Sequence, residues 1–332
     1  MRKSFFYCFS IGLTIVGGII GAGFITGKEI YEFFCKDFSV VGLFLTFACF
    51  TAFTFLIMSV KISSEIWKVI GVTVSICNIV ITGCMISVLN DIYFRIFRFT
   101  ENIEIFTILS IILVFIISLK GVDFVVKANL VLMPITIVSV VCLSWVKIDN
   151  FSTETMPKSF SGLAKPFVYV GFNLTLSMAL IKKSGEKLSP LRKLTCSIIV
   201  STVLCSLIFI IGKAIIFCED FDNLPFRNLF VKDRKHLIII DIITLFAVFT
   251  TMFSSVFSSI DFGGIKLKIS HKILMVILSC FISKIGFSTI VERLYPLLGI
   301  VGYLIILFIY LSRVFFPKER RERTCHPLKG RV

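Results

Sequence analysis

Long uncharged apolar runs recur along the chain, and they constrain its fold more than any other feature. A helix that crosses the hydrocarbon core of a bilayer needs about 20 mostly apolar residues. Stretches of about this size are Ser4–Gly27, Phe38–Val60, Val69–Asn90, Ala128–Val146, Leu194–Gly212, Ile242–Ile260 and Leu294–Ser312. Shorter or interrupted stretches are Ile105–Leu119, Pro166–Ile181 and Ile273–Phe287. The sequence therefore predicts an all-α integral membrane protein with about ten transmembrane helices.

The composition agrees with a bilayer as the main partner. Hydrophobic residues make up 57% of the chain and charged residues only 17%, which excludes two soluble domains. A net charge of +15 would favour nucleic-acid binding in a soluble protein. Because the bases lie between the apolar runs, membrane topology explains them better, and no nucleic-acid partner is expected.

The distribution of lysine and arginine predicts the orientation. In alternate loops these residues favour cytoplasmic N- and C-termini. The first apolar run has features of a cleaved signal peptide, but it continues past its small residues and many spans follow. We therefore expect a single transmembrane domain over residues 1–316, in halves of about 1–147 and 159–316, and a basic cytoplasmic tail over 317–332.

Few residues suggest covalent or metal chemistry. The eleven cysteines are scattered from Cys8 to Cys325 without a CxxC pair, and the three histidines are far apart. No general acid or base accompanies a nucleophile. We expect no enzyme activity, no metal site and no cofactor, apart from Na⁺ or H⁺ as a possible coupling ion.

The segment Val16–Phe24 carries four glycines in the middle of the first span. Each glycine costs about 1 kcal/mol in a helix, so the backbone there is either packed very closely or unwound. The pairs Gly17-xxx-Gly21 and Gly23-xxx-Gly27 are typical of close helix packing. An unwound segment would instead leave carbonyl and amide groups free to bind ions or substrate.

The sixth span has a similar irregularity. A proline, a glycine and an asparagine lie within Lys165–Leu174. Spans one and six are equivalent if the protein consists of two five-helix halves. Paired interruptions in equivalent helices are typical of a transporter binding site, and close helix packing is the alternative.

Hydroxyl groups are concentrated in the eighth span, within Ala247–Ser255. Such groups commonly bond a carbonyl one turn back on their own helix. Alternatively, Thr250 with Thr251, or Ser254 with Ser255, could give a small cation its oxygen ligands.

Two motifs carry a family resemblance. The stretch Thr14–Ile30 resembles the opening of the YkvI-type membrane proteins, which are bacterial relatives of the amino acid-polyamine-organocation transporters, and Tyr169–Asn173 is similar to their sixth-helix segment. The resemblance implies a leucine-transporter fold, with two inverted five-helix repeats and broken helices one and six. It implies that substrate-binding residues are Gly21, Ala22, Gly23, Phe24, Tyr169, Gly171 and Asn173. It also implies a cation site formed by Gly17, Ile20, Thr250 and Thr251, to which the hydroxyl pattern adds Ser254.

Charged residues follow the glycine segment. Lys28 and Glu32 form an i,i+4 pair, whereas Glu29 has no such local partner. We expect Glu29 to border the outer vestibule as a gate or protonatable group paired with Lys165 or Arg293. A solvated carboxylate at the membrane interface is the alternative.

The sequence thus favours a secondary active transporter in a bacterial plasma membrane. Its expected substrate is a small amine-containing metabolite, with an amino acid favoured, and its driving ion is Na⁺ or H⁺. A non-transporting amino-acid sensor of the spore-germination type is the main alternative, and an ion channel is the third. The oligomeric state cannot be predicted from the sequence.

Overall fold

The computed structural model describes residues 2–35, 40–60, 64–96, 103–147, 163–186, 188–216, 224–261 and 267–315. The predicted basic tail, 317–332, lies outside these residues. The α-helices are α1 (Arg2–Ile19), α2 (Ala22–Ile25), α3 (Lys28–Ile30), α4 (Val40–Ser59), α5 (Ser64–Ile96), α6 (Ile103–Leu119), α7 (Val122–Val146), α8 (Ala164–Gly185), α9 (Pro190–Ile215), α10 (Pro225–Asn228), α11 (Arg234–Asp261), α12 (Ile269–Ile282), α13 (Phe287–Thr289) and α14 (Tyr295–Phe315). Three further short helices are the π-helices η1 (Tyr31–Cys35) and η6 (Ile290–Leu294) and the 3₁₀-helix η5 (Ser283–Ile285).

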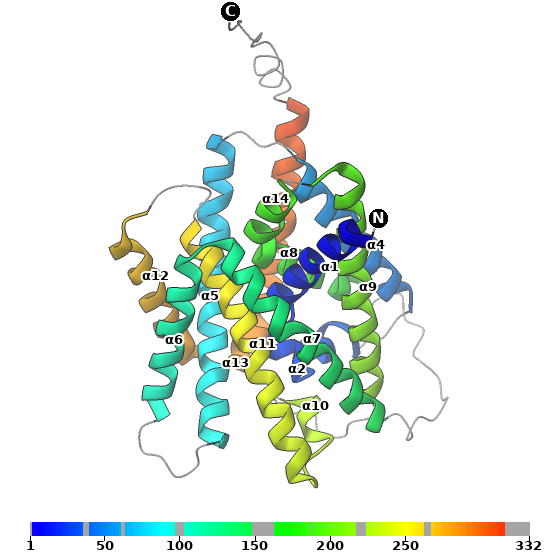
Figure 1. Cartoon of the computed structure of the whole chain (residues 1–332), viewed down its shortest axis with the longest axis vertical. Helices are drawn as coiled ribbons and strands as arrows, with labels where there is room; N and C mark the ends of the chain where they lie inside the picture. Colours follow the sequence, from blue (N-terminus) through cyan, green and yellow to red (C-terminus); the bar gives the residue numbers. More distant parts are fainter. Residues whose placement is uncertain are drawn as a thin grey trace, which may run out of the picture.

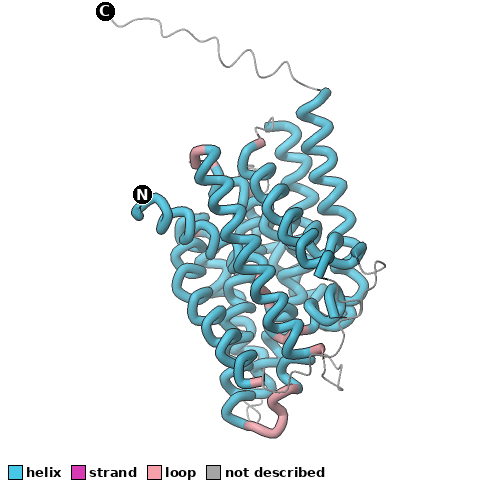
Figure 2. The backbone as a smooth tube through the Cα atoms, turned by 90° about the vertical axis from the view of Figure 1, so that its right-hand side faces the viewer, coloured by secondary structure: helices cyan, strands magenta, loops and turns pink. Residues whose placement is uncertain are grey.

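Helices dominate the described chain, and short connections join several of them (Figure 2). Seven stretches are long and apolar enough to cross a membrane: Val41–Ser59, Glu65–Ile96, Asp123–Val146, Ala164–Gly185, Pro190–Ile215, Arg234–Ile260 and Phe287–Leu311. The helices α1, α6 and α12 are shorter and occupy three further predicted positions. The all-helical membrane class is confirmed, and the count of ten spans remains a prediction.

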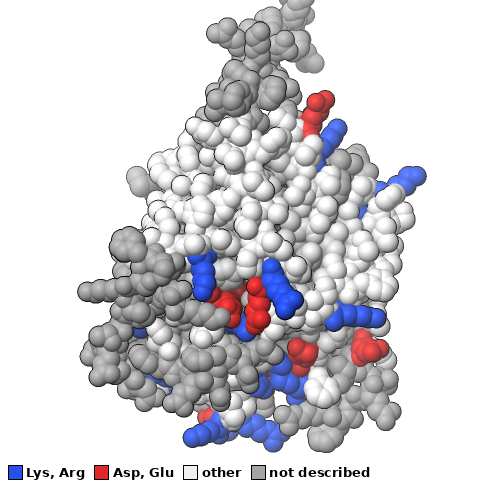
Figure 3. Space-filling model, turned by 180° about the vertical axis from the view of Figure 1, so that it is seen from behind, with Lys and Arg blue, Asp and Glu red and all other residues white. Residues whose placement is uncertain are grey.

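The outer surface of the bundle is apolar. Large hydrophobic side chains of α6 and α12 are exposed, including Ile108, Leu109, Leu274 and Leu278. On the face shown in Figure 3, charged side chains gather mainly toward one end and leave a broad uncharged area beside them. An apolar exterior of this extent would be unstable in water and fits contact with lipid.

The interrupted first span lies inside the bundle. Helix α1 contacts α7, α8, α9 and α11, and Figure 1 shows it passing among these helices. The side chains of Ile15, Val16, Ile20 and Phe24 are fully buried. A hydrophobic segment surrounded by other helices, rather than by lipid, can tolerate irregular backbone.

The structure corrects one part of the predicted fold. Helix α8 is continuous through Gly171, so the expected break in the sixth span is absent from the described backbone. Pro166 lies in the first turn of α8, where its missing N–H leaves no helical bond unmade. A Cβ atom added at Gly171 would lie 2.5 Å from the carbonyl oxygen of Gly299 in α14. Gly171 therefore serves the close approach of α8 and α14, which is the packing alternative.

Candidate functional site

The first span is interrupted at Ile20 and Gly21, as the glycine segment predicted. The amide of Ile20 still donates to the carbonyl of Val16 at 2.8 Å, whereas Gly21 has extended backbone with φ −102° and ψ −171°. The carbonyl of Ile20 accepts a hydrogen bond from the Thr251 hydroxyl at 3.1 Å. The break thus turns a main-chain oxygen away from its own helix and toward α11.

A second irregularity follows one turn later. Gly27 has φ +79°, a left-handed conformation that glycine adopts without strain. The carbonyl of Thr26 accepts a hydrogen bond from the Phe226 amide of α10 at 2.8 Å. The short helix α10 therefore contacts the turn between α2 and α3.

The structure brings together some of the predicted ion-binding residues. Ile20 and Thr251 are in contact, and a Cβ atom added at Gly18 would lie 3.2 Å from the Ser254 hydroxyl oxygen. In contrast, the α-carbon of Gly17 faces α7, where an added Cβ atom would lie 2.7 Å from Met133 Cγ. The Thr250 hydroxyl donates to the Ala247 carbonyl at 2.9 Å, as the own-helix alternative expected.

Two polar residues beside Ser254 were not singled out from the sequence. The Asn129 amide nitrogen of α7 lies 3.4 Å from Ser254 Oγ and 3.3 Å from the Thr14 carbonyl. An added Cβ atom at Gly18 would lie 3.1 Å from Ser177 Oγ of α8. Both Asn129 Oδ1 and Ser177 Oγ are buried without a hydrogen-bond partner among the described residues. Their polarity inside apolar spans was the signal that could have identified them.

The predicted substrate-binding residues lie in the same interior. Tyr169, Phe24 and Asn173 are fully buried. The Asn173 side-chain amide donates to the Tyr169 carbonyl at 2.9 Å, while Asn173 Oδ1 and the Tyr169 hydroxyl have no hydrogen-bond partner in the described part of the chain. A Cβ atom at Gly21 would lie 3.2 Å from Thr251 Oγ1. Ala22 is fully buried, and Gly171 contacts α14 instead of presenting an unwound carbonyl.

Glu29 departs from its predicted environment. It is 2% exposed, and its carboxyl group lies against Gly23, where an added Cβ atom would lie 2.7 Å from Glu29 Cγ. The expected pairing with Lys165 or Arg293 is not among the ion pairs identified for the described residues, and both of these side chains are exposed whereas Glu29 is buried. Glu29 faces the interior, because the chain turns at Gly27, directly before α3.

Lys28 points elsewhere and carries the ion pairs of this segment. Its ammonium lies 2.8 Å from a carboxylate oxygen of Glu292 and 3.7 Å from one of Glu32. The i,i+4 pair predicted from the sequence is present, and the closer contact with Glu292 joins the first and last spans. A single sequence offers no signal for a pairing across 264 positions.

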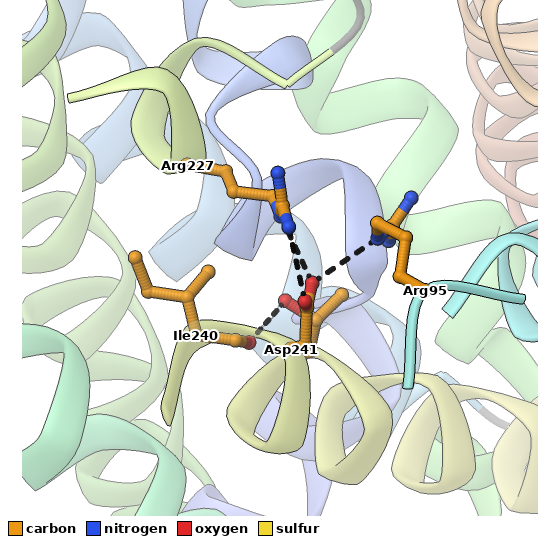
Figure 4. Close-up of polar contacts among 5 residues, drawn as sticks. Arg95, Arg227, Ile240 and Asp241 are labelled. Atoms are coloured by element: carbon orange, nitrogen blue, oxygen red, sulfur yellow. Dashed lines mark hydrogen bonds and ion pairs between the residues drawn. The ribbon is translucent and has the colours of Figure 1, made fainter. Parts of the chain in front are cut away.

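Asp241 forms an interior charge cluster that the sequence did not reveal. It lies within α11 rather than at its end, and its carboxylate accepts hydrogen bonds from Arg227 Nε at 3.0 Å and Arg95 Nε at 3.3 Å. Figure 4 shows the two arginines converging on this carboxylate from two directions. The cluster joins α10 to α11 and to the end of α5. Across the residues described here, no group of three His, Cys, Asp or Glu side chains could hold a metal ion.

The sequence is similar to that of one curated membrane protein. No family model matches the sequence. The chain is 22% identical over 328 residues to the uncharacterized membrane protein YkvI of Bacillus subtilis strain 168, covering 88% of this chain and 92% of that protein. The chain resembles YkvI. This confirms the resemblance inferred from the glycine segment and the sixth span.

Solved structures establish the fold. One similar structure is that of Mhp1, a nucleobase-cation-symport-1 family transporter, in a closed conformation with bromovinylhydantoin bound. It superposes on this chain with a TM-score of 0.68 at 13% identity and covers 95% of this chain and 79% of that chain. A mutant manganese transporter of Eremococcus coleocola gives a TM-score of 0.55 at 10% identity, covering 93% and 77%. The chain therefore has a leucine-transporter-like fold, and its structural neighbours are transporters rather than enzymes.

Proposed function

We propose that the protein is a secondary active transporter of a small amine-containing metabolite in a bacterial plasma membrane, with both termini in the cytoplasm. An amino acid is one such metabolite. The observation that carries the proposal is the break at Ile20 and Gly21, which turns the Ile20 carbonyl toward α11 inside a transporter fold. Broken helices in such folds bind substrates and coupling ions near the middle of the bilayer.

The proposed Na⁺ site lies between the break and α11. The Ile20 carbonyl and the Thr251 hydroxyl are 3.1 Å apart, and Ser254 lies one turn further along α11. Carbonyl and hydroxyl oxygens suit a small hard cation. Thr250 contributes less to this site, because its hydroxyl bonds its own helix.

Glu29 is the proposed site for H⁺ if protons replace sodium. It is buried beside Gly23 at the other side of the break. A carboxyl group that faces the interior of the bundle can gain or lose a proton as the site opens to one side of the membrane and then to the other.

Uptake by the purified chain in liposomes tests this proposal. We expect accumulation of a radiolabelled amine or amino acid under an inward Na⁺ or H⁺ gradient and none after the gradient is dissipated. Thr251→Val should abolish the response to Na⁺, since valine keeps the shape of threonine and lacks the hydroxyl. Thr244→Val is the matched control, because that buried α11 hydroxyl donates to the Ile240 carbonyl, away from the break. Absence of gradient-driven uptake across both ligand classes would refute the transporter assignment.

A further inference from the structure

The Glu29 carboxyl group is buried, and no ion pair with a described cation balances it. Its Oε2 atom is inaccessible and has no hydrogen-bond partner in the described part of the chain. The neighbouring Lys28 ammonium is engaged by Glu292 and Glu32. An isolated buried carboxylate is costly in a membrane interior, so this position favours a bound cation or a proton.

A cluster of aromatic rings lies around Tyr169 of α8. The ring of Tyr169 lies 5.1 Å from that of Phe34, 5.5 Å from that of Phe33 and 5.7 Å from that of Phe172, measured between centroids. The ring of Phe172 stacks on that of Tyr295 at 4.3 Å. The rings come from the first, sixth and last spans, so the cluster lies where these three meet.

Glu29 lies on the same segment as part of this cluster. It is four residues before Phe33, whose ring contacts that of Tyr169, and the side chains of all three residues are buried. Aromatic faces attract cations through their quadrupole, and a carboxylate among them adds a full negative charge. Together they have the chemistry of a site for an organic ammonium group.

The hydrogen-bonding groups point to the same ligand class. Glu29 Oε2 and Asn173 Oδ1 are buried acceptors without donors among the described residues, and the Tyr169 hydroxyl is also unpartnered. The Asn173 amide nitrogen donates to the Tyr169 carbonyl, so it is already engaged. A primary ammonium has three donors and no acceptor, whereas a carboxylate has only acceptors. Because the unpartnered atoms of this site are mostly acceptors, the site favours a ligand with an ammonium group over a ligand that also carries a carboxylate.

The Glu29 side chain also covers the backbone that would face a substrate carboxylate. Its carboxyl group lies directly against Gly23 in the break. A ligand carboxylate placed there would meet the negative charge of Glu29 at short range. The chain thus has its own carboxylate where an amino-acid substrate would need to place one.

We propose that Glu29, with the rings of Tyr169, Phe172 and Tyr295, forms a recognition site for a monocationic amine that carries an apolar or aromatic group and no carboxylate. The proposal rests on the proposed transporter function and narrows its substrate class. The ammonium would contact Glu29 and the unpartnered acceptors of α8, and the apolar part would pack against the rings.

Pairs of ligands that differ only in a carboxylate test the proposal. The pairs are phenethylamine with phenylalanine, tyramine with tyrosine, and isoamylamine with leucine. Binding to the full-length purified protein is measured from the ligand-induced rise in the thermal midpoint, and uptake is measured in liposomes. We expect each amine to bind at least about 10-fold more tightly than its partner amino acid, since one charge pair and one charge repulsion distinguish them.

Three variants identify the recognising group. Glu29→Gln keeps the shape of the side chain and removes its charge, so we expect amine binding to weaken about 100-fold. Glu29→Asp restores the charge one methylene shorter and should recover part of the affinity. Glu32→Gln is the matched control, because that carboxylate lies on the same segment at 19% side-chain exposure, and binding should stay within about twofold.

The outcomes separate this proposal from the proposed function. Tighter binding of amino acids, or amine binding unchanged in Glu29→Gln, would overturn the amine site and leave the transporter assignment standing. Failure of both ligand series to bind or to be taken up by the wild-type protein would overturn both. Preferential amine binding that is lost in Glu29→Gln and partly recovered in Glu29→Asp would support the proposal.

Discussion

Replacing Asp241 with asparagine should destabilise the protein strongly. The substitution keeps the size of the side chain and removes the only negative charge drawn between Arg95 and Arg227 in Figure 4. Arg227 makes two contacts with the carboxylate, at 3.0 and 3.2 Å, and Arg95 makes one at 3.3 Å. Asparagine would leave two partly buried cations beside each other without the carboxylate that contacts both of them.

The magnitude follows from these distances and from the exposure of the cluster. At an effective dielectric constant of about 20, a charge pair at this separation is worth about 5 kcal/mol before desolvation. Removing one partner of a fully buried pair costs about 3–5 kcal/mol. Because the side chains of Arg95 and Arg227 are 20% and 17% exposed, solvent screens part of this. We expect a loss of about 2–3 kcal/mol of stability for Asp241→Asn.

Thermal unfolding in detergent measures the effect. Asp241→Asn should lower the unfolding midpoint by several degrees, and Asp241→Asn combined with Arg95→Met should recover part of the loss because it removes the repulsion. Glu104→Gln is the control, since Glu104 is an exposed carboxylate in the first turn of α6. An unchanged midpoint in Asp241→Asn, or a double variant that loses the sum of both single effects, would show that the charges act independently and that this reasoning is wrong.

Three further substitutions test other contacts through the same unfolding assay. Gly171→Ala should cost about 1–3 kcal/mol because its new Cβ atom would lie 2.5 Å from the Gly299 carbonyl oxygen, and an unchanged midpoint would contradict the close approach of α8 and α14. Glu29→Gln should raise the midpoint in the absence of ligand at a pH at which the carboxyl group is ionised, because it removes a buried charge that no described cation balances, so a lower midpoint would indicate a stabilising partner. Glu292→Gln should change stability by less than about 1 kcal/mol because Glu292 is 47% exposed in its pair with Lys28, and a larger loss would show that solvent screens this pair less than its exposure implies.

Local sequence patterns predicted the fold class and the break in the first span. Apolar run length follows directly from bilayer thickness, so Val41–Ser59 and Pro190–Ile215 could be located without any knowledge of tertiary contacts. Four glycines within a few residues carry a helix penalty that any environment must compensate, which made the irregularity at Ile20 and Gly21 predictable. Both features, the apolar runs and the glycine-rich segment, are set by residues close together in the sequence, which is why they could be predicted from it.

The environments of Gly171 and Asp241 depend on contacts between segments that are far apart in the sequence, so the sequence did not predict them. Gly171 has the same side chain as Gly21, but it lies where the backbone of α14 approaches, and its helix stays intact. Asp241 directly precedes the apolar stretch Ile242–Ile260, and its partners, Arg95 and Arg227, come from other segments, so no sign of the charge cluster was visible in the sequence. A single sequence reports that a residue is unusual for its helix, and the tertiary structure decides whether packing or binding accounts for it.

For Glu29, one property could be predicted from nearby residues and another could not. Its spacing from Lys28 and Glu32 correctly indicated that it lacks the local i,i+4 partner, yet the turn at Gly27 directs it inward rather than to the vestibule. Lys28, one residue earlier, is also buried, but it forms an ion pair with Glu292. The irregular backbone after the break therefore gives two adjacent buried charges different partners: Lys28 has an ion pair, and Glu29 lies against Gly23. A helix that continued without the turn would not place a carboxylate against Gly23, so the glycines that weaken the first span also create the site at which an amine would bind.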